Sequence, residues 1–145
     1  MPWTNMNREI TSKEEKLLTK GKETTIKTNI EHLKTLSYSE AIREALIQAM
    51  TLDKNVFIMG QGINDKIGMF GATTDIYKQF GEDRVFDTPL AETGLTGMAV
   101  GAALNGLRPV YCHNRPDFLM LAMDQIVNHA SKYNYMSGGQ CPIPL

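Results

Sequence analysis

Short apolar runs alternate with longer helical patterns over most of this chain, and this alternation limits the folds that the chain can adopt. No two of the strand-length runs are joined by a two-residue hairpin turn, and each is followed by a helix-length segment. Parallel strands need such crossovers. The sequence therefore predicts an α/β fold with a parallel sheet flanked by helices on both faces. The predicted strands are Val56–Met59, Val85–Asp87 and Pro109–His113, and the predicted helices cover residues 37–50, 74–80, 90–105 and 116–135.

Both ends of this region carry local signals. Ser37 and Glu40 have the spacing of a capping box, which predicts that the first helix begins there. The last residues, Pro142–Leu145, follow the final predicted helix and indicate the opening of a further strand. We therefore expect the sheet to be incomplete at the C-terminus.

The first 35 residues differ in composition from the rest of the chain. Thr, Lys, Glu and Asn dominate, and no aromatic residue occurs between Trp3 and Tyr38. Such a segment has too little apolar surface to dock firmly, so we expect a polar, mobile extension over residues 1–35 and one α/β domain over residues 36–145. The extension is rich in acidic residues and no apolar signal-peptide core follows Met1. These features predict no targeting role and a cytoplasmic location.

Composition excludes several classes of function. With 15 basic and 16 acidic residues the net charge is −1, which favours no binding to nucleic acid. The apolar runs are too short to span a bilayer, so we expect no membrane partner. Cys112 and Cys141 lack CxxC spacing, which predicts reduced, inert thiols. Neither they nor the three histidines, His32, His113 and His129, show metal-ligand spacing, so we expect no metal site on this chain.

The segment Arg84–Gly94 places one carboxylate, Glu92, in the first turn of a glycine-spaced helix. Pro89 suits the start of a helix, where its missing N–H costs nothing. Gly94, Gly97 and Gly101 leave one side of this helix almost without side chains, so another backbone or a ligand can approach closely. Spacing alone favours a tightly packed helix whose acid is stabilised by the helix dipole, with a catalytic carboxylate as the alternative.

The stretch from Arg84 to Val110, RVFDTPLAETGLTGMAVGAALNGLRPV, resembles the signature of the β subunits of thiamine-diphosphate-dependent 2-oxoacid dehydrogenases. These are the E1 components of the pyruvate, branched-chain and acetoin type. The similarity covers Leu36 to Leu145, about three-quarters of the chain, and several motifs occur in the family's order. They include SYSEAIREAL, the strand Val56–Gly60, and the segments 123–128 and 135–139.

The resemblance implies that this chain is the module that binds the aminopyrimidine ring of thiamine diphosphate. By motif position, Glu92 would hydrogen-bond a ring nitrogen and favour the imino tautomer, whose exocyclic nitrogen removes the thiazolium C2 proton. Phe118 would pack on the ring, with core packing as its alternative role. Leu90 and Thr88 would line the pocket, and Gln61 would contribute from the loop after the first strand.

The same resemblance implies that the cofactor is shared with a partner. A Gly-Asp-Gly diphosphate segment is absent from the sequence, so an E1 α subunit would hold the diphosphate and Mg²⁺. A second β chain would complete a heterotetramer, and a lipoyl-bearing E2 acyltransferase would accept the product. The expected function is oxidative decarboxylation of a 2-oxoacid, with the isolated chain inactive.

Two departures from the family pattern keep an alternative open. Gln61-Gly62 stands where E1 β chains commonly carry an acidic pair, and the family's C-terminal domain is missing from the 145 residues. The alternative is therefore a catalytically inactive, truncated or assembly module that keeps only the fold. A dinucleotide site at Gly60-x-Gly62 is weakly supported, because Asp65 replaces the third glycine.

Two basic residues near the end of the third predicted strand have two interpretations each. His113 could contact substrate or cofactor phosphate, or it could be a plain edge residue. Arg115 could attract a substrate carboxylate, or it could form a surface salt bridge.

Overall fold

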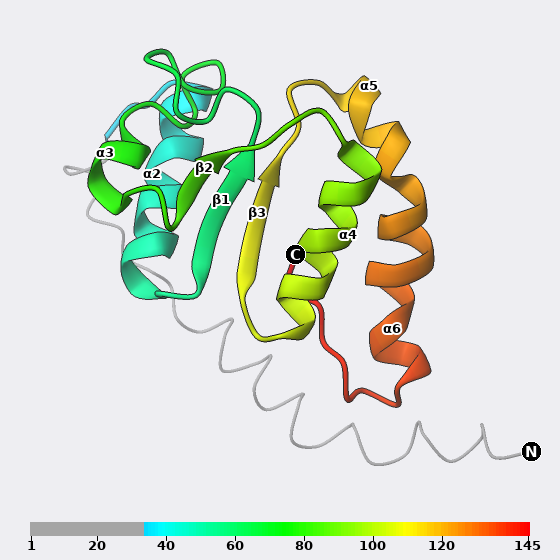
Figure 1. Ribbon diagram of the computed structural model, residues 1–145. Helices are drawn as coiled ribbons and strands as arrows, with labels where there is room; N and C mark the ends of the chain where they lie inside the picture. Colours follow the sequence, from blue (N-terminus) through cyan, green and yellow to red (C-terminus); the bar gives the residue numbers. More distant parts are fainter. Residues whose placement is uncertain (1–33) are drawn as a thin grey trace, which may run out of the picture. The chain divides into compact units, whose positions relative to one another are not determined.

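The computed structural model describes residues 34–145, and these form a parallel sheet with helices on both sides (Figure 1). The predicted N-terminal extension, with His32, lies outside the described residues apart from its last two positions. The strands are β1 (Val56–Gly60), β2 (Val85–Asp87) and β3 (Arg108–Cys112), in the order β2-β1-β3. The helices are α2 (Tyr38–Leu52), α3 (Ile76–Phe80), α4 (Glu92–Leu104), α5 (Pro116–Leu119) and α6 (Ser131–Met136).

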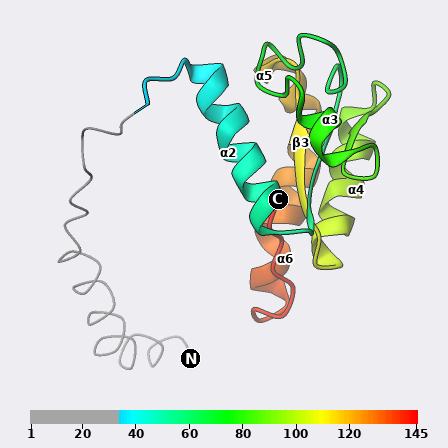
Figure 2. The same cartoon turned by 90° about the vertical axis from the view of Figure 1, so that its left-hand side faces the viewer.

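Each face of the sheet carries its own apolar cluster. On one face, Ile58 and Val85 are fully buried together with Met50 of α2 and Ile76 of α3. On the other face, the next residue of β1 packs with α4, in a cluster of Met59, Leu95 and Ala99. Alternate residues of a strand point to opposite faces, so one strand supplies both clusters. In Figure 2, α2 and α4 lie on opposite sides of the sheet. The predicted fold class is therefore confirmed.

The strand order explains why the helices divide between the two faces. The chain moves from β1 to β2 through α3, and then returns past β1 to β3 through α4. Right-handed crossovers that run in opposite directions along a sheet place their helices on opposite faces. β1 is thus followed by a connection on one face, while β2 is followed by a connection on the other. Within residues 34–145, no helix has the length and apolar content to cross a membrane.

The first helix begins as the capping-box spacing predicted. The Ser37 hydroxyl accepts a hydrogen bond from the Glu40 backbone N–H, and the Glu40 carboxylate accepts one from the Ser37 backbone N–H at 2.8 Å. Two N–H groups that the helix itself cannot satisfy are thereby paired.

Arg84 connects three parts of the fold at the end of the sheet opposite the strand carboxyl ends. Its guanidinium donates hydrogen bonds to the backbone carbonyls of Met50, Asp53 and Val56, at 2.9 Å, 3.0 Å and 2.7 Å. It also lies 5.2 Å from the ring centre of Phe80. One side chain therefore holds the end of α2, the turn after it and the start of β1 against β2.

The C-terminal part differs from its prediction in two ways. The single helix predicted over residues 116–135 is instead divided into α5, a 3₁₀ turn, a π-helical stretch and α6. The strand predicted to open at Pro142–Leu145 is wrong, because these residues form no ladder and Leu145 N donates to Ile143 O instead. Two prolines in four residues remove two of the N–H groups that a ladder needs. Between α5 and α6 lie a 3₁₀ turn, η3 (Met120–Ala122), and a π-helical stretch, η4 (Asp124–Ala130).

Candidate functional site

The carboxyl ends of all three strands meet at one edge of the sheet. Gly60 is in register with Asp87 of β2 and with Cys112 of β3. A Cβ on Gly60 would lie 2.5 Å from the carbonyl oxygen of Cys112, so only glycine fits there. Because the connections after β1 and β2 go to opposite faces, this edge has the crevice at which open α/β sheets bind ligands.

Glu92 is the first residue of α4 and lies at this edge, as predicted. Ala91 precedes it and offers no side-chain cap, so the helix N-terminus keeps its unpaired N–H groups. The Glu92 side chain is half-buried. It forms no hydrogen bond or salt bridge within residues 34–145. The carboxylate is therefore available to a ligand that approaches the edge.

The link between β2 and α4 contains the predicted residues Thr88 and Leu90. Thr88 N donates to Gly60 O at 2.8 Å, which holds the link against the end of β1. The Thr88 hydroxyl is buried and has no hydrogen-bond partner in the described part of the chain. Buried polar atoms are nearly always paired, so this one calls for a partner. Leu90, two residues after Thr88, is 76% exposed and presents an apolar surface.

Gln61 follows β1 and is tied to the loop after β3. Asn114 Nδ2 donates to Gln61 Oε1 at 3.1 Å. Both residues line an open cavity of about 450 Å³ that also includes Gly62 and Phe70. The sequence places Gln61 at this edge, but it gives no sign of the pairing with Asn114, because the two residues are 53 positions apart in the chain.

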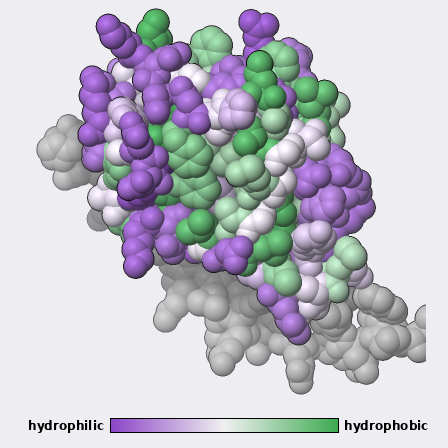
Figure 3. Space-filling view, in the orientation of Figure 1, coloured by the Kyte–Doolittle hydropathy of each residue, from purple (hydrophilic) through white to green (hydrophobic). Residues whose placement is uncertain are grey.

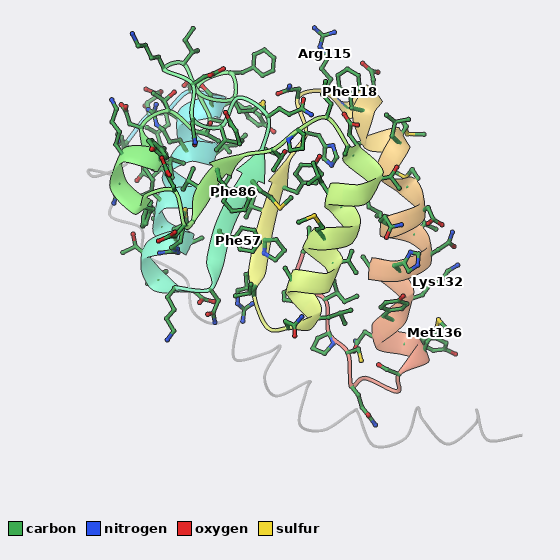
Figure 4. All side chains as sticks on the ribbon, in the orientation of Figure 1. Phe57, Phe86, Arg115, Phe118, Lys132 and Met136 are labelled. Carbon is green, nitrogen blue, oxygen red and sulfur yellow. The ribbon has the colours of Figure 1, made fainter. Side chains whose placement is uncertain are left out.

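Phe118 lies on α5, close in the chain to Arg115, and both are drawn at the same end of the molecule (Figure 4). Phe118 is 38% exposed and belongs to neither buried cluster, so core packing does not occupy it. The segment that follows is joined to α4, because the Thr93 hydroxyl donates to Leu121 O. This bond holds the turn after α5 next to the first turn of α4, where Glu92 lies.

The charge of Glu92 acts on two residues at the end of β3, Tyr111 and His113. The sequence left the role of His113 open and assigned none to Tyr111. Their ring centres are 4.2 Å apart at an angle of 51°. Burial raises the pKa of Tyr111, and the charge of Glu92 raises it further. Burial lowers the pKa of His113, and the charge of Glu92 opposes that effect. Residues two apart in an extended segment share a face, so the alternation along the predicted strand Pro109–His113 was the signal that pointed to this pair.

The two cysteine thiols take no part in the candidate site, and the described residues form no metal site. Cys112 packs against the opposite face of the sheet, and burial raises the pKa of its thiol to about 11. Both Cys112 and Cys141 are free. Across residues 34–145, no group of three or more His, Cys, Asp or Glu side chains is arranged to hold a metal ion.

Asp87 holds the loop after β1 in place. One oxygen of its carboxylate accepts hydrogen bonds from the backbone N–H groups of Ile63, at 2.6 Å, and Asn64, at 3.2 Å. We expect Asp87→Ala to speed amide hydrogen exchange at Ile63 by about tenfold or more, because hydrogen bonds to charged groups contribute roughly 1.5–3 kcal/mol. Asp87→Asn, which keeps an acceptor oxygen, is the matched control and should show a smaller change. Equal exchange in the alanine variant and the unchanged protein would show that the carboxylate does not hold the loop.

Comparison with known proteins identifies relatives over the same residues. Residues 34–145 match the family model described as the transketolase, pyrimidine binding domain. The chain is 42% identical over 113 residues to the 2-oxoisovalerate dehydrogenase subunit beta of Bacillus subtilis (strain 168), which is 77% of this chain and 35% of that protein. It is 46% identical over 110 residues to the pyruvate dehydrogenase E1 component subunit beta of Rickettsia bellii, which is 74% of this chain and 34% of that protein. It therefore spans about a third of the length of these relatives.

Proposed function

Because the chain belongs to the family of transketolase pyrimidine-binding domains, we propose that it binds the aminopyrimidine ring of thiamine diphosphate and activates this cofactor through Glu92. The observation that carries the proposal is the state of Glu92. It begins α4 at the carboxyl edge of the sheet, and its carboxylate has no hydrogen-bond partner within residues 34–145. A general acid–base group needs this kind of access to the proton that it transfers.

The residues around Glu92 fit such a ring. An aminopyrimidine is a flat group with polar atoms at its rim, so it needs apolar faces and a few hydrogen-bond partners. Phe118 and Leu90 offer exposed apolar surface. The hydroxyl of Thr88, which has no hydrogen-bond partner among the described residues, offers a polar partner. Gln61 would border the pocket from the loop after β1.

The proposed chemistry divides between the cofactor and this chain. When bound, thiamine diphosphate supplies a carbon nucleophile for the decarboxylation of a 2-oxoacid. Glu92 would hold or share a proton at a nitrogen of the pyrimidine ring. An exposed carboxylate does this poorly, and a partner that covers Glu92 would favour its protonated form by desolvation. We therefore expect the isolated chain to be inactive.

The complete enzyme would be an assembly. The relatives named above are β subunits of 2-oxoisovalerate and pyruvate dehydrogenases. We propose that an E1 α subunit supplies the diphosphate and Mg²⁺ site, that a second β chain completes a heterotetramer, and that a lipoyl-bearing E2 acyltransferase accepts the product. The predicted cytoplasmic location belongs to the same proposal.

The outer side of α4 is a suitable surface for the partner. Among residues 34–145, a Cβ on Gly94 or on Gly101 would meet no atom within 4 Å, so no described residue covers either glycine. Met98, which lies between them, is 66% exposed. In Figure 3, apolar and neutral surface gathers over the sheet and α4, between hydrophilic regions on either side. A partner's backbone could approach this side of α4 closely.

We expect Gly101→Leu to weaken the association with the α subunit at least tenfold while leaving the fold of this chain intact. The leucine fills open space in the isolated chain, and leucine favours a helix over glycine by roughly 0.5–1 kcal/mol. In the complex it would hold the partner away from α4. The measurement is the dissociation constant of the chain from the α subunit, with the thermal midpoint of the free chain recorded alongside.

Gly97→Ala is the matched control for this variant. A Cβ on Gly97 would lie 3.2 Å from Oε1 of Gln125, so the residue already contacts its own chain. Its substitution should act on the stability of the chain first, and on association less. An unchanged dissociation constant for Gly101→Leu would show that the partner binds elsewhere.

The proposed function is tested by isolating this chain from its own cells with thiamine diphosphate and Mg²⁺ present. We expect a complex with a protein that carries a Gly-Asp-Gly diphosphate segment, with thiamine diphosphate bound and with activity on a 2-oxoacid. A complex that binds no thiamine diphosphate would contradict the proposal. It would favour the alternative of an assembly module that keeps only the fold.

A further inference from the structure

The pair formed by Tyr111 and His113 is the part of the site that the proposed function does not yet use. The two rings are in contact, with centres 4.2 Å apart. Both side chains line a cavity of about 340 Å³ between β3, α4 and the helical segment after α5. Thr96, a residue only 2% exposed, also lines this cavity, and its hydroxyl has no hydrogen-bond partner in the described part of the chain.

Few charged groups surround His113. Directly before it in the chain, at the end of β3, lie Tyr111 and the thiol of Cys112. Burial raises the pKa of both groups, so both are neutral near pH 7. Arg115 and Asp117, which follow at α5, are exposed. On the helical segment beyond, Asp124 lies 3.8 Å from His129. Glu92 lies four residues before Thr96 on α4 and therefore on the same side of that helix, and Thr96 and His113 line one cavity. The charge that acts on His113 is that of Glu92.

We propose that His113 is a positioning residue of the Glu92 site, which stays neutral against the Tyr111 ring and thereby leaves Glu92 able to share a proton with the cofactor. The inference rests on the proposed function of Glu92. His113 need not touch the cofactor in this role. It acts on the cofactor only through its effect on the protonation of Glu92.

The direction of the effect follows from elementary electrostatics. An opposite charge close to a carboxyl group favours the carboxylate. A protonated His113 would therefore hold Glu92 as the anion, and the anion has no proton to donate to a ring nitrogen. Burial of His113 disfavours the imidazolium and lowers the pKa of this group, so the neutral form is present near neutral pH and is lost as the pH falls through that pKa. The site therefore loses activity on the acid side.

The first test measures the titration of His113 in the full chain by NMR, with the signal assigned through the His113→Gln variant. We expect the pKa of His113 to lie below the ordinary histidine value of about 6.5, and to fall further in Glu92→Gln, because the variant removes the charge that stabilises the imidazolium. An unchanged pKa of His113 in Glu92→Gln would overturn the inference.

The second test compares two variants in the assembled complex. His113→Lys places a permanent cation beside Glu92, and His113→Gln places a neutral side chain there. We expect kcat/KM of the lysine variant to be about tenfold below that of the glutamine variant, since an adjacent opposite charge changes a protonation equilibrium by about this factor or more. Protonation of His113 is expected to lower the activity at acid pH. The pH profile of His113→Gln should therefore lack this loss. Equal rates and equal profiles in the two variants would overturn the inference.

The two tests separate this inference from the proposed function. Should the Glu92→Gln complex remain active, the proposed function fails, because Glu92 is then not required. The titration would still report whether His113 responds to the charge of Glu92. Should Glu92 be required while the two His113 variants behave alike, the proposed function stands and only the role of His113 is lost.

Discussion

Replacing Glu92 with glutamine is expected to reduce the 2-oxoacid decarboxylase activity of the assembled complex by about 10²–10⁴-fold, the usual contribution of a positioned acid–base group. Glutamine has nearly the same shape, so the pocket keeps its form, but its amide cannot hold and return a proton. The binding of thiamine diphosphate should change much less than kcat. Steady-state kinetics with a titration of the cofactor would separate these two quantities.

Asp117→Asn is the matched control for the glutamate variant. Asp117 lies on α5 near the same edge, is exposed, and has no assigned role in the site. This substitution removes the same unit of charge, so a general electrostatic effect would appear in both variants. Full decarboxylase activity in the Glu92→Gln complex would falsify the assignment of Glu92.

The largest expected effect on stability belongs to Arg84. We expect Arg84→Ala to lower the free energy of unfolding by about 3 kcal/mol, because it removes the hydrogen bonds of the guanidinium to the backbone carbonyls of Met50, Asp53 and Val56, at roughly 1 kcal/mol each. It also removes the contact of the guanidinium with the Phe80 ring. Urea denaturation of the full chain measures the change as a shift of the midpoint with an unchanged slope.

Arg108→Ala is the control for this prediction. Arg108 forms a salt bridge to Asp53 at 2.6 Å, and its side chain is 56% exposed. Exposed ion pairs contribute up to about 1 kcal/mol, so the loss should be small. Equal destabilisation by the two arginine variants would show that the three carbonyl contacts of Arg84 do not set its contribution.

Much of the fold followed from local patterns in the sequence. The apolar runs that include Ile58 and Val85 predicted buried strands, and these strands formed with the expected bounds or within one residue of them. The capping box at Ser37 was also predicted, because its donors and acceptors lie three residues apart in the chain. Signals of this kind depend on residues close together in the chain, so they can be recognised without the tertiary fold.

Other features depended on distant contacts and were missed. The contact between Gln61 and Asn114 joins loops that come together only because β1 and β3 are neighbours in the sheet. The change from α5 through a 3₁₀ turn to a π-helical stretch has no cue in the spacing of apolar residues. The strand predicted to open at Pro142 does not form. Its apolar residues favour a strand, but its two prolines lack the N–H donors that a strand needs.

By itself, the sequence determined that this chain forms a parallel α/β domain and that Glu92 opens a glycine-spaced helix at the carboxyl edge of the sheet. These properties are encoded in the period of apolar residues and in the chemistry of single turns. Only the tertiary structure decided which side chains surround Glu92. It brought Tyr111 and His113 close enough to Glu92 for its charge to act on them. It also buried the hydroxyl of Thr88 with no hydrogen-bond partner among residues 34–145. The physical reason is that burial and electrostatic coupling depend on the order of the strands, which no local pattern specifies.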